Sequence, residues 1–201
     1  MKTIIGDTNG KSINVVEVGA GFGGLARLLC RFENIEKYTI IDFPEVCALA
    51  KRYLENYPEC LDKIAFIDAS DIMKSWTQLE PAELFIASAS VAELNNELQC
   101  FYFTNFIQKA DWSYIVYNSA HKEENLKFLS EFLENSEQKG LFFKVQNPWF
   151  RILHIFFSRN EKSIENINGL KFESLKKYLG SYKFLLKRII RSIYFKVTNK
   201  Y

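Results

Sequence analysis

Four glycines lie between a β-branched run and a helical pattern near the start of the chain. The run Asn14–Val18 predicts a strand, and the apolar spacing of Leu25–Arg31 predicts a helix after the loop. The glycines of the loop are Gly19, Gly21, Gly23 and Gly24. A backbone without Cβ atoms can approach a ligand closely, and free N–H groups at a helix start attract a carboxylate or phosphate. The pattern predicts a ligand-binding loop.

An acid ends the second predicted strand. Asp42 follows Tyr38–Ile41, at about the distance from the loop expected for a carboxylate that binds ribose hydroxyls. Gly19, Gly21 and Gly24 also satisfy the spacing of a dinucleotide-binding loop. The loop alone therefore leaves two cofactors open, S-adenosyl-L-methionine (SAM) and NAD.

Longer segments around these residues resemble a known family. They are EVGAGFGGLARLL from Glu17, YTIIDFPEVCALAKRYL from Tyr38, SASVAELNNE from Ser88 and YNSAH from Tyr117. In this order, over residues 5–158, they resemble the sugar O-methyltransferases, a branch of the class I SAM-dependent methyltransferases. The glycine motif is shared by the whole class, whereas DFPEV and AELNNE are similar to the sugar branch.

The resemblance implies a fold, an activity and site residues. The fold is a Rossmann-like α/β sheet of seven strands in the order 3-2-1-4-5-7-6, with the last strand antiparallel. The activity is methyl transfer from SAM to a hydroxyl of a sugar or glycan precursor, as in polysaccharide biosynthesis. The implied cofactor-binding residues are Glu17, Gly19, Gly21 and Gly23 for the methionine part, Asp42 for the ribose, Asp68 and Ala69 for the adenine, and Ser88 for the pocket wall.

Two residues near strand ends are candidates for the general base, because a sugar hydroxyl is a poor nucleophile at neutral pH. His121 follows the fifth predicted strand and has a suitable ordinary pKa, although a loop histidine can also have a purely structural role. Glu93 follows the fourth; it could instead bind sugar hydroxyls or occupy the first turn of a helix. His154 lies in an apolar strand, which favours a core position.

Residue spacing and hydropathy disfavour a metal site, a signal peptide and a membrane span. The four cysteines form no CxxC pair and have no nearby histidine, and Asp68 and Asp71 lack a third ligand, so no metal is predicted. The segment Met1–Gly10 has no apolar core of a signal peptide, and no apolar run could span a bilayer. These features predict a cytoplasmic protein.

Strand and helix patterns alternate along residues 1–159 and predict the domain that positions these residues. Further strands are expected at Ile64–Ile67, Leu84–Ser88 and Tyr114–Tyr117, and helices at Pro44–Asn56, Glu93–Ala110 and Glu123–Ser136. No helix fits between Leu141–Val145 and Ile152–Phe157, so these two strands should form an antiparallel pair.

Residues 160–201 form a separate basic tail with ten Lys or Arg and three Glu. Apolar residues recur at three- and four-residue steps from Phe172 to Val197, which predicts a basic amphipathic helix. Such a helix could bind the inner membrane surface, or it could pack on the chain's own domain or on a partner protein, and this second alternative is favoured. Only about a dozen residues precede the first strand, whereas the family generally has covering helices there, so a homodimer partner could supply the lid.

Three alternatives to a sugar methyltransferase follow from the same residues. An NAD-dependent sugar oxidoreductase is disfavoured by the terminal hairpin and by the lack of a Tyr-x-x-x-Lys pair after the fourth strand. A catalytically impaired scaffold subunit would fit the short N-terminus. A nucleic-acid substrate is not expected, because residues 1–159 are acidic and no Asn/Asp-Pro-Pro-aromatic motif follows the fourth strand.

Overall fold

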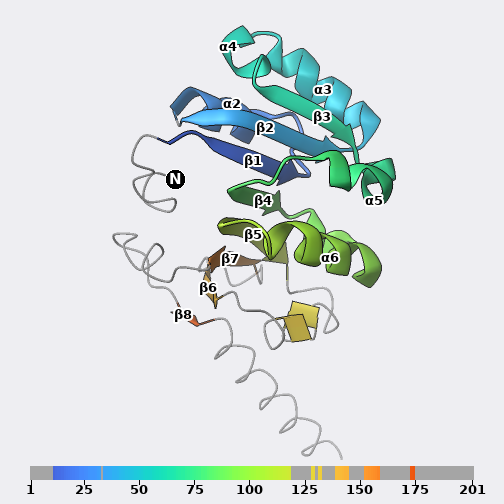
Figure 1. The fold of residues 1–201 in the computed structure, drawn as a ribbon, viewed down its shortest axis with the longest axis vertical. Coiled ribbons are helices and arrows are strands. Elements are labelled where there is room, and N and C mark those ends of the chain that lie inside the picture. The colour runs from blue at the N-terminus through green and yellow to red at the C-terminus, as the bar shows by residue number, and fades with distance from the viewer. Residues whose placement is uncertain are drawn as a thin grey trace, which may run out of the picture.

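One eight-stranded sheet organises the computed structural model, which describes residues 11–32, 34–118, 128–129, 131–132, 139–144, 152–158 and 173–174. The strands are β1 (Ile13–Val18), β2 (Ile35–Asp42), β3 (Ile64–Asp68), β4 (Leu84–Ser88), β5 (Trp112–Asn118), β6 (Lys139–Lys144), β7 (Ile152–Ser158) and β8 (Glu173–Ser174). Their order across the sheet is β3-β2-β1-β4-β5-β7-β6-β8 (Figure 1).

The strand directions confirm the predicted doubly wound sheet with its antiparallel end. Strands β1 to β5 pair in parallel, and β7 lies antiparallel between β5 and β6. The predicted order 3-2-1-4-5-7-6 is therefore correct, and β8 adds one more strand beside β6. In a parallel sheet the carboxyl ends of β1, β2, β3 and β4 reach the same edge, which brings the predicted site residues together.

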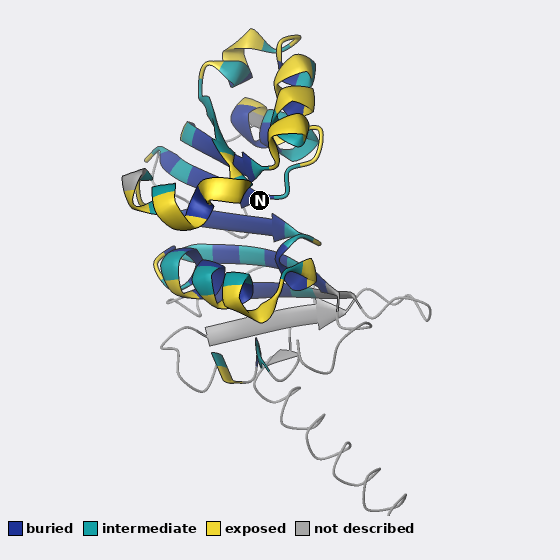
Figure 2. Ribbon diagram, turned by 90° about the vertical axis from the view of Figure 1, so that its right-hand side faces the viewer, coloured by how far each residue is buried: buried dark blue, intermediate teal, exposed yellow. Residues whose placement is uncertain are grey.

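Helices cover both faces of the sheet (Figures 1 and 2). On one face, α2 (Gly24–Phe32), α3 (Pro44–Leu54) and α4 (Pro58–Leu61) contribute to the core cluster that includes Val15. On the other face, α5 (Ile72–Ser75), α6 (Asn96–Tyr102) and the π-helical turn η4 (Phe103–Ile107) contribute to the core cluster that includes Val16. Alternate residues of a strand point to opposite faces, so a run of β-branched residues supplies both apolar layers.

The described part of the predicted helix Glu123–Ser136 consists of four helical residues. Leu129 is fully buried, and the rings of Phe128 and Phe132 meet Phe103 with centroids 5.0 and 4.6 Å apart. Edge-to-face aromatic pairs of this kind add to the apolar core. The other residues of that helix lie outside the described residues.

The segment after β4 differs from the predicted helix Glu93–Ala110. Glu93 ends a separate 3₁₀ turn, η3 (Val91–Glu93), and α6 begins only at Asn96. The helix starts there because the side chain of Asn95 accepts a hydrogen bond of 2.9 Å from the N–H of Leu98. Glu93 therefore lies in the short 3₁₀ turn η3 and not in the first turn of the α-helix α6.

The basic tail is described at two residues only. Glu173 and Ser174 pair with β6, so the prediction of a helix is wrong at these positions, where an open sheet edge offers backbone partners. The remainder of residues 160–201 lies outside the described residues. No helix in the described ranges is long and apolar enough to cross a membrane.

Candidate cofactor-binding site

The glycine loop has a left-handed backbone conformation, which other residues adopt only at a cost in free energy. Gly19, Gly21 and Gly23 have φ values of 75°, 57° and 84°. The N–H of Gly19 donates to the carbonyl of Ile41 at 3.0 Å, and that of Gly23 donates to Ala20 at 3.1 Å. These bonds fold the chain tightly between β1 and α2, and left-handed backbone favours glycine at each position.

The three glycines face different surroundings. A Cβ at Gly23 would lie 3.0 Å from Leu54 Cδ1, and one at Gly19 would overlap Ser90, so both positions are closed by the protein itself. A Cβ at Gly21 would meet nothing within 4 Å. The open side of the loop is therefore at Gly21, where a ligand could lie on the backbone.

The carboxylate of Asp42 stands directly beside this opening. Its Oδ2 accepts from the N–H of Gly21 at 3.3 Å, and its Oδ1 accepts from Phe43 at 2.9 Å. Asp68 is the partner of Asp42 in the register of β2 and β3, so two acids end neighbouring strands. The side chain of Asp68 is exposed and accepts from the N–H of Ser70 at 2.8 Å.

Apolar side chains follow both acids. Phe43 is 59% exposed and Met73 is 48% exposed, while Ala69, which begins the turn η1 (Ala69–Asp71), is half-buried. Exposed apolar groups beside carboxylates suit a ligand with a flat ring and hydroxyl groups. Phe43 was not among the predicted site residues, although an aromatic residue directly after a strand-ending acid is a recognisable signal.

Glu17 lies in β1, two residues before the glycine loop, and is almost inaccessible. It is 2% exposed, and its Oε2 accepts a hydrogen bond of 2.8 Å from the hydroxyl of Tyr38. Burial raises its pKa to about 7, the bond from Tyr38 opposes this shift, and the charge of Asp42 adds to it. The contact of Glu17 with a cofactor stays a prediction.

The loop after β4 forms the neighbouring wall. Ser88 ends the strand and is half-buried, and the hydroxyl of Ser90 donates to the carbonyl of Val18 at 2.6 Å. Glu93 is exposed, and its carboxylate has no hydrogen bond or ion pair within the described ranges. His121, the other predicted base, lies outside the described residues.

His154 has partners that fit its predicted structural position. Its Nδ1 is 2.7 Å from the hydroxyl of Tyr114, the two rings are stacked, and burial lowers the pKa of the imidazole. It lies on β7 and is half-buried rather than fully buried. Among the residues that the structure describes, no three His, Cys, Asp or Glu side chains gather as metal ligands do.

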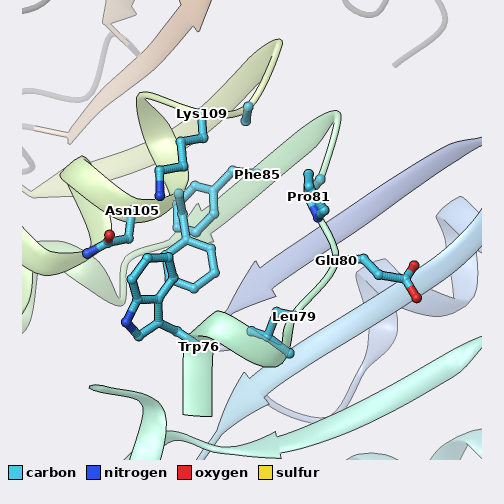
Figure 3. A pocket seen from close by; sticks show the side chains of 10 residues that line it. Trp76, Leu79, Glu80, Pro81, Phe85, Asn105 and Lys109 are labelled. Atoms are coloured by element: carbon cyan, nitrogen blue, oxygen red, sulfur yellow. The ribbon is translucent and has the colours of Figure 1, made fainter. Parts of the chain in front are cut away.

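A cavity of about 130 Å³ lies elsewhere in the fold. Phe85, at the amino end of β4, lies at its wall, and the ammonium of Lys109 stands 4.5 Å from the ring centre of Trp76 (Figure 3). The glycine loop follows the opposite, carboxyl ends of the parallel strands. This cavity is therefore not part of the site around Gly21 and Asp42.

Comparisons with known proteins give a fold and no family. No protein-family model matches the sequence, and no curated protein is similar to it. The chain is similar in structure to M. capricolum TrmK in complex with S-adenosyl-homocysteine (SAH), with a TM-score of 0.58, 15% identity, and 94% and 88% of the two chains covered.

Two further solved structures share the architecture. An rRNA methylase from Streptococcus thermophilus has a TM-score of 0.56 and 11% identity, with 73% of this chain and 86% of that chain covered. Precorrin-6y C5,15-methyltransferase from Geobacter metallireducens has a TM-score of 0.55 and 10% identity, with 73% and 80% covered. The chain thus has the Rossmann-like methyltransferase fold that the sequence predicted.

Proposed function

We propose that this chain is a SAM-dependent methyltransferase whose cofactor lies across the carboxyl ends of β1, β2 and β3. The observation that carries the proposal is the open space above Gly21 beside the carboxylate of Asp42. Backbone N–H groups of the loop suit the carboxylate of an amino acid, and carboxylate oxygens suit ribose hydroxyls. When bound, SAM would supply a sulfonium methyl group: an acceptor lone pair bonds to the methyl carbon while the carbon–sulfur bond breaks, and SAH leaves. The shared fold of an SAH-bound methyltransferase supports this cofactor.

Under this proposal some side chains bind the cofactor, and Ser88 lies near the methyl group that is transferred. Asp42 binds the ribose hydroxyls, and Asp68 with Ala69 borders the adenine, against which Phe43 packs. Ser88 lines the wall nearest the transferred methyl group, because it ends β4 next to β1. These roles need no movement of the sheet, since the strand ends already lie side by side.

A sugar hydroxyl is the first acceptor that we propose. Its support is the resemblance of the DFPEV and AELNNE blocks to sugar O-methyltransferases, together with an exposed carboxylate at Glu93. A carboxylate that has no partner among the described residues is available to accept the hydroxyl proton as the new oxygen–carbon bond forms. His121 is the alternative base.

RNA is a second acceptor that we propose, because one of the similar structures is an rRNA methylase. Another is an enzyme of the small molecule precorrin-6y, so the shared fold accommodates both classes of acceptor. The acidic net charge of residues 1–159 disfavours nucleic acid, but net charge does not describe the surface of the site itself. Both acceptor classes therefore belong in the same transfer assay.

The base is tested by two variants, Glu93→Gln and His121→Gln. Loss of a general base lowers turnover by about 100-fold or more while cofactor binding is retained. For one of the two variants we expect lower turnover with unchanged SAH affinity, when methyl transfer and SAH binding are measured on the same preparations. Equal turnover in wild type and in both variants would mean that neither residue is the base.

Calorimetric titration with SAM, SAH and NAD tests the cofactor. We expect saturable binding of SAM and SAH, a loss of affinity of about tenfold to 100-fold in Asp42→Ala, and no change in Asp62→Ala, which removes an exposed acid after α4. Binding of NAD without SAM would favour the oxidoreductase. Binding of neither would favour a scaffold subunit.

The basic tail, residues 160–201, is proposed to make a separate contact with a protein surface, with the inner membrane surface as its alternative. Its ten basic residues support both. Sedimentation of the full chain with anionic vesicles tests the membrane alternative: binding that weakens as salt rises supports it, and absence of binding leaves packing on the domain or on a partner protein.

A further inference from the structure

The loop after β4 is bound to the strands on both of its sides. The N–H of Ala89 donates to the carbonyl of Val116 in β5 at 3.0 Å. The hydroxyl of Ser90 donates to the carbonyl of Val18, the last residue of β1, at 2.6 Å. Two adjacent residues therefore connect the loop to its two neighbouring strands.

Ala89 adopts a backbone that alanine normally avoids. Its φ of 58° is the one positive value at a non-glycine residue within the described ranges. Left-handed backbone places the Cβ close to the following carbonyl oxygen, which costs free energy. Such a conformation persists only where surrounding contacts hold it, and these are commonly found at functional sites.

Ser90 also packs directly on the glycine loop. The position that a Cβ would take at Gly19 overlaps Ser90 Cβ and lies 2.9 Å from Ser90 Oγ. Gly19 is therefore glycine for two reasons: its φ of 75°, and the serine that fills the space in front of it. The same side chain contacts the glycine loop through its Cβ and β1 through its hydroxyl.

We propose that Ser90 is a positioning residue that fixes the loop after β4 against the glycine loop. The wall with Ser88 and Glu93 then keeps one position relative to the cofactor loop at Gly19 to Gly21. This inference rests on the proposed function, because it assigns the two loops to the acceptor and the cofactor. Ser90 itself acts through Val18 and Gly19 and needs no contact with either ligand.

The first test compares two serines that make the same kind of bond. Ser90→Ala removes the bond to Val18, whereas Ser113→Ala removes a buried bond of 3.5 Å to the carbonyl of Ile107, at the amino end of β5. Both variants should lose some thermal stability. We expect Ser90→Ala to weaken SAH binding about threefold to tenfold and Ser113→Ala to leave it unchanged.

The second test is a double-mutant cycle between Gly19→Ala and Ser90→Gly. Each single variant should lower thermal stability and SAH affinity, the first by overlap with Ser90 and the second by loss of the hydroxyl bond and added backbone freedom. In the Gly19→Ala background, Ser90→Gly should instead raise both quantities, because it removes the overlap. Recovery stays partial, since alanine at this φ remains unfavourable.

The outcomes separate this inference from the proposed function. If wild type binds neither SAM nor SAH, the proposed function fails, while the stability cycle still reports the contact. If wild type binds SAH but Ser90→Ala behaves as Ser113→Ala does, Ser90 has no positioning role. The proposal would also be overturned if the losses of thermal stability in Gly19→Ala and Ser90→Gly simply add in the double variant. This comparison can be made even if the Gly19→Ala protein is only partly folded.

Discussion

The buried carboxyl group of Glu17 predicts a stability that falls as pH rises through the weakly acidic range. Burial raises its pKa from 4.5 to about 7 in the folded protein. Between these two values the folded state holds a proton that the unfolded state has lost, so folding becomes less favourable with rising pH. A pKa difference of roughly two to three units corresponds to about 3 kcal/mol of unfolding free energy at 1.36 kcal/mol per unit.

The perturbation is Glu17→Gln, and the assay is urea unfolding between about pH 5 and about pH 7.5. An amide oxygen can still accept the bond from Tyr38, so the variant keeps the contact and loses the titration. We expect the wild type to lose most of this 3 kcal/mol (an order-of-magnitude figure) across the range and the variant to lose much less.

A matched control is Glu36→Gln, which changes an exposed carboxyl on β2, the strand of Tyr38. It should follow the pH dependence of the wild type. If Glu17→Gln shows the same slope as the wild type, the buried carboxyl does not titrate in this range, and the reasoning from burial is wrong.

Three further changes test the backbone and the cofactor edge. Ala89→Gly should raise the unfolding free energy by about 0.5–1 kcal/mol in urea, because glycine accepts its φ of 58°; a decrease would show that the alanine side chain contributes more than its strain costs. Gly23→Ala should lower the free energy by at least about 1 kcal/mol, given a φ of 84° and Leu54 Cδ1 at 3.0 Å, and unchanged stability would contradict the closed packing. Phe43→Ala should weaken SAH binding about threefold to tenfold at unchanged melting temperature, because the ring is 59% exposed; equal affinity would remove Phe43 from the site.

Most of the sheet could be predicted because its strands are short runs rich in apolar, β-branched or aromatic residues. Asn14–Val18 and Leu84–Ser88 coincide with β1 and β4 within a residue, and the absence of a helix before Ile152 predicted the antiparallel pair. Periodicity failed where an element is short. The helix Pro58–Leu61 has one turn, which is too few residues for an apolar pattern.

Two positions show where tertiary contacts or a local cap decide the structure. Glu173 fits a helical pattern, yet the open edge of β6 supplies backbone partners for it that no sequence window contains. The start of α6 could have been found, because Asn95 is a preferred N-cap residue and Glu93 is not.

The site was predicted by residue type, but its internal contacts were not. The glycine loop and Asp42 lie together as their spacing indicated. Spacing could not reveal that Gly19 is closed by Ser90, 71 positions later, while Gly21 stays open. Nor could it show Glu17 bound to Tyr38, because that contact depends on the pairing of β1 with β2.

Transfer of a labelled methyl group tests the central claim most directly. Wild-type protein is incubated with methyl-labelled SAM and, separately, with sugar-containing glycan precursors and with RNA. Methyltransferase activity predicts time-dependent label in one of the two acceptor classes, and its loss in Asp42→Ala but not in Asp62→Ala. Saturable binding of SAM with no label in either class would contradict the account and leave a cofactor-binding scaffold in its place.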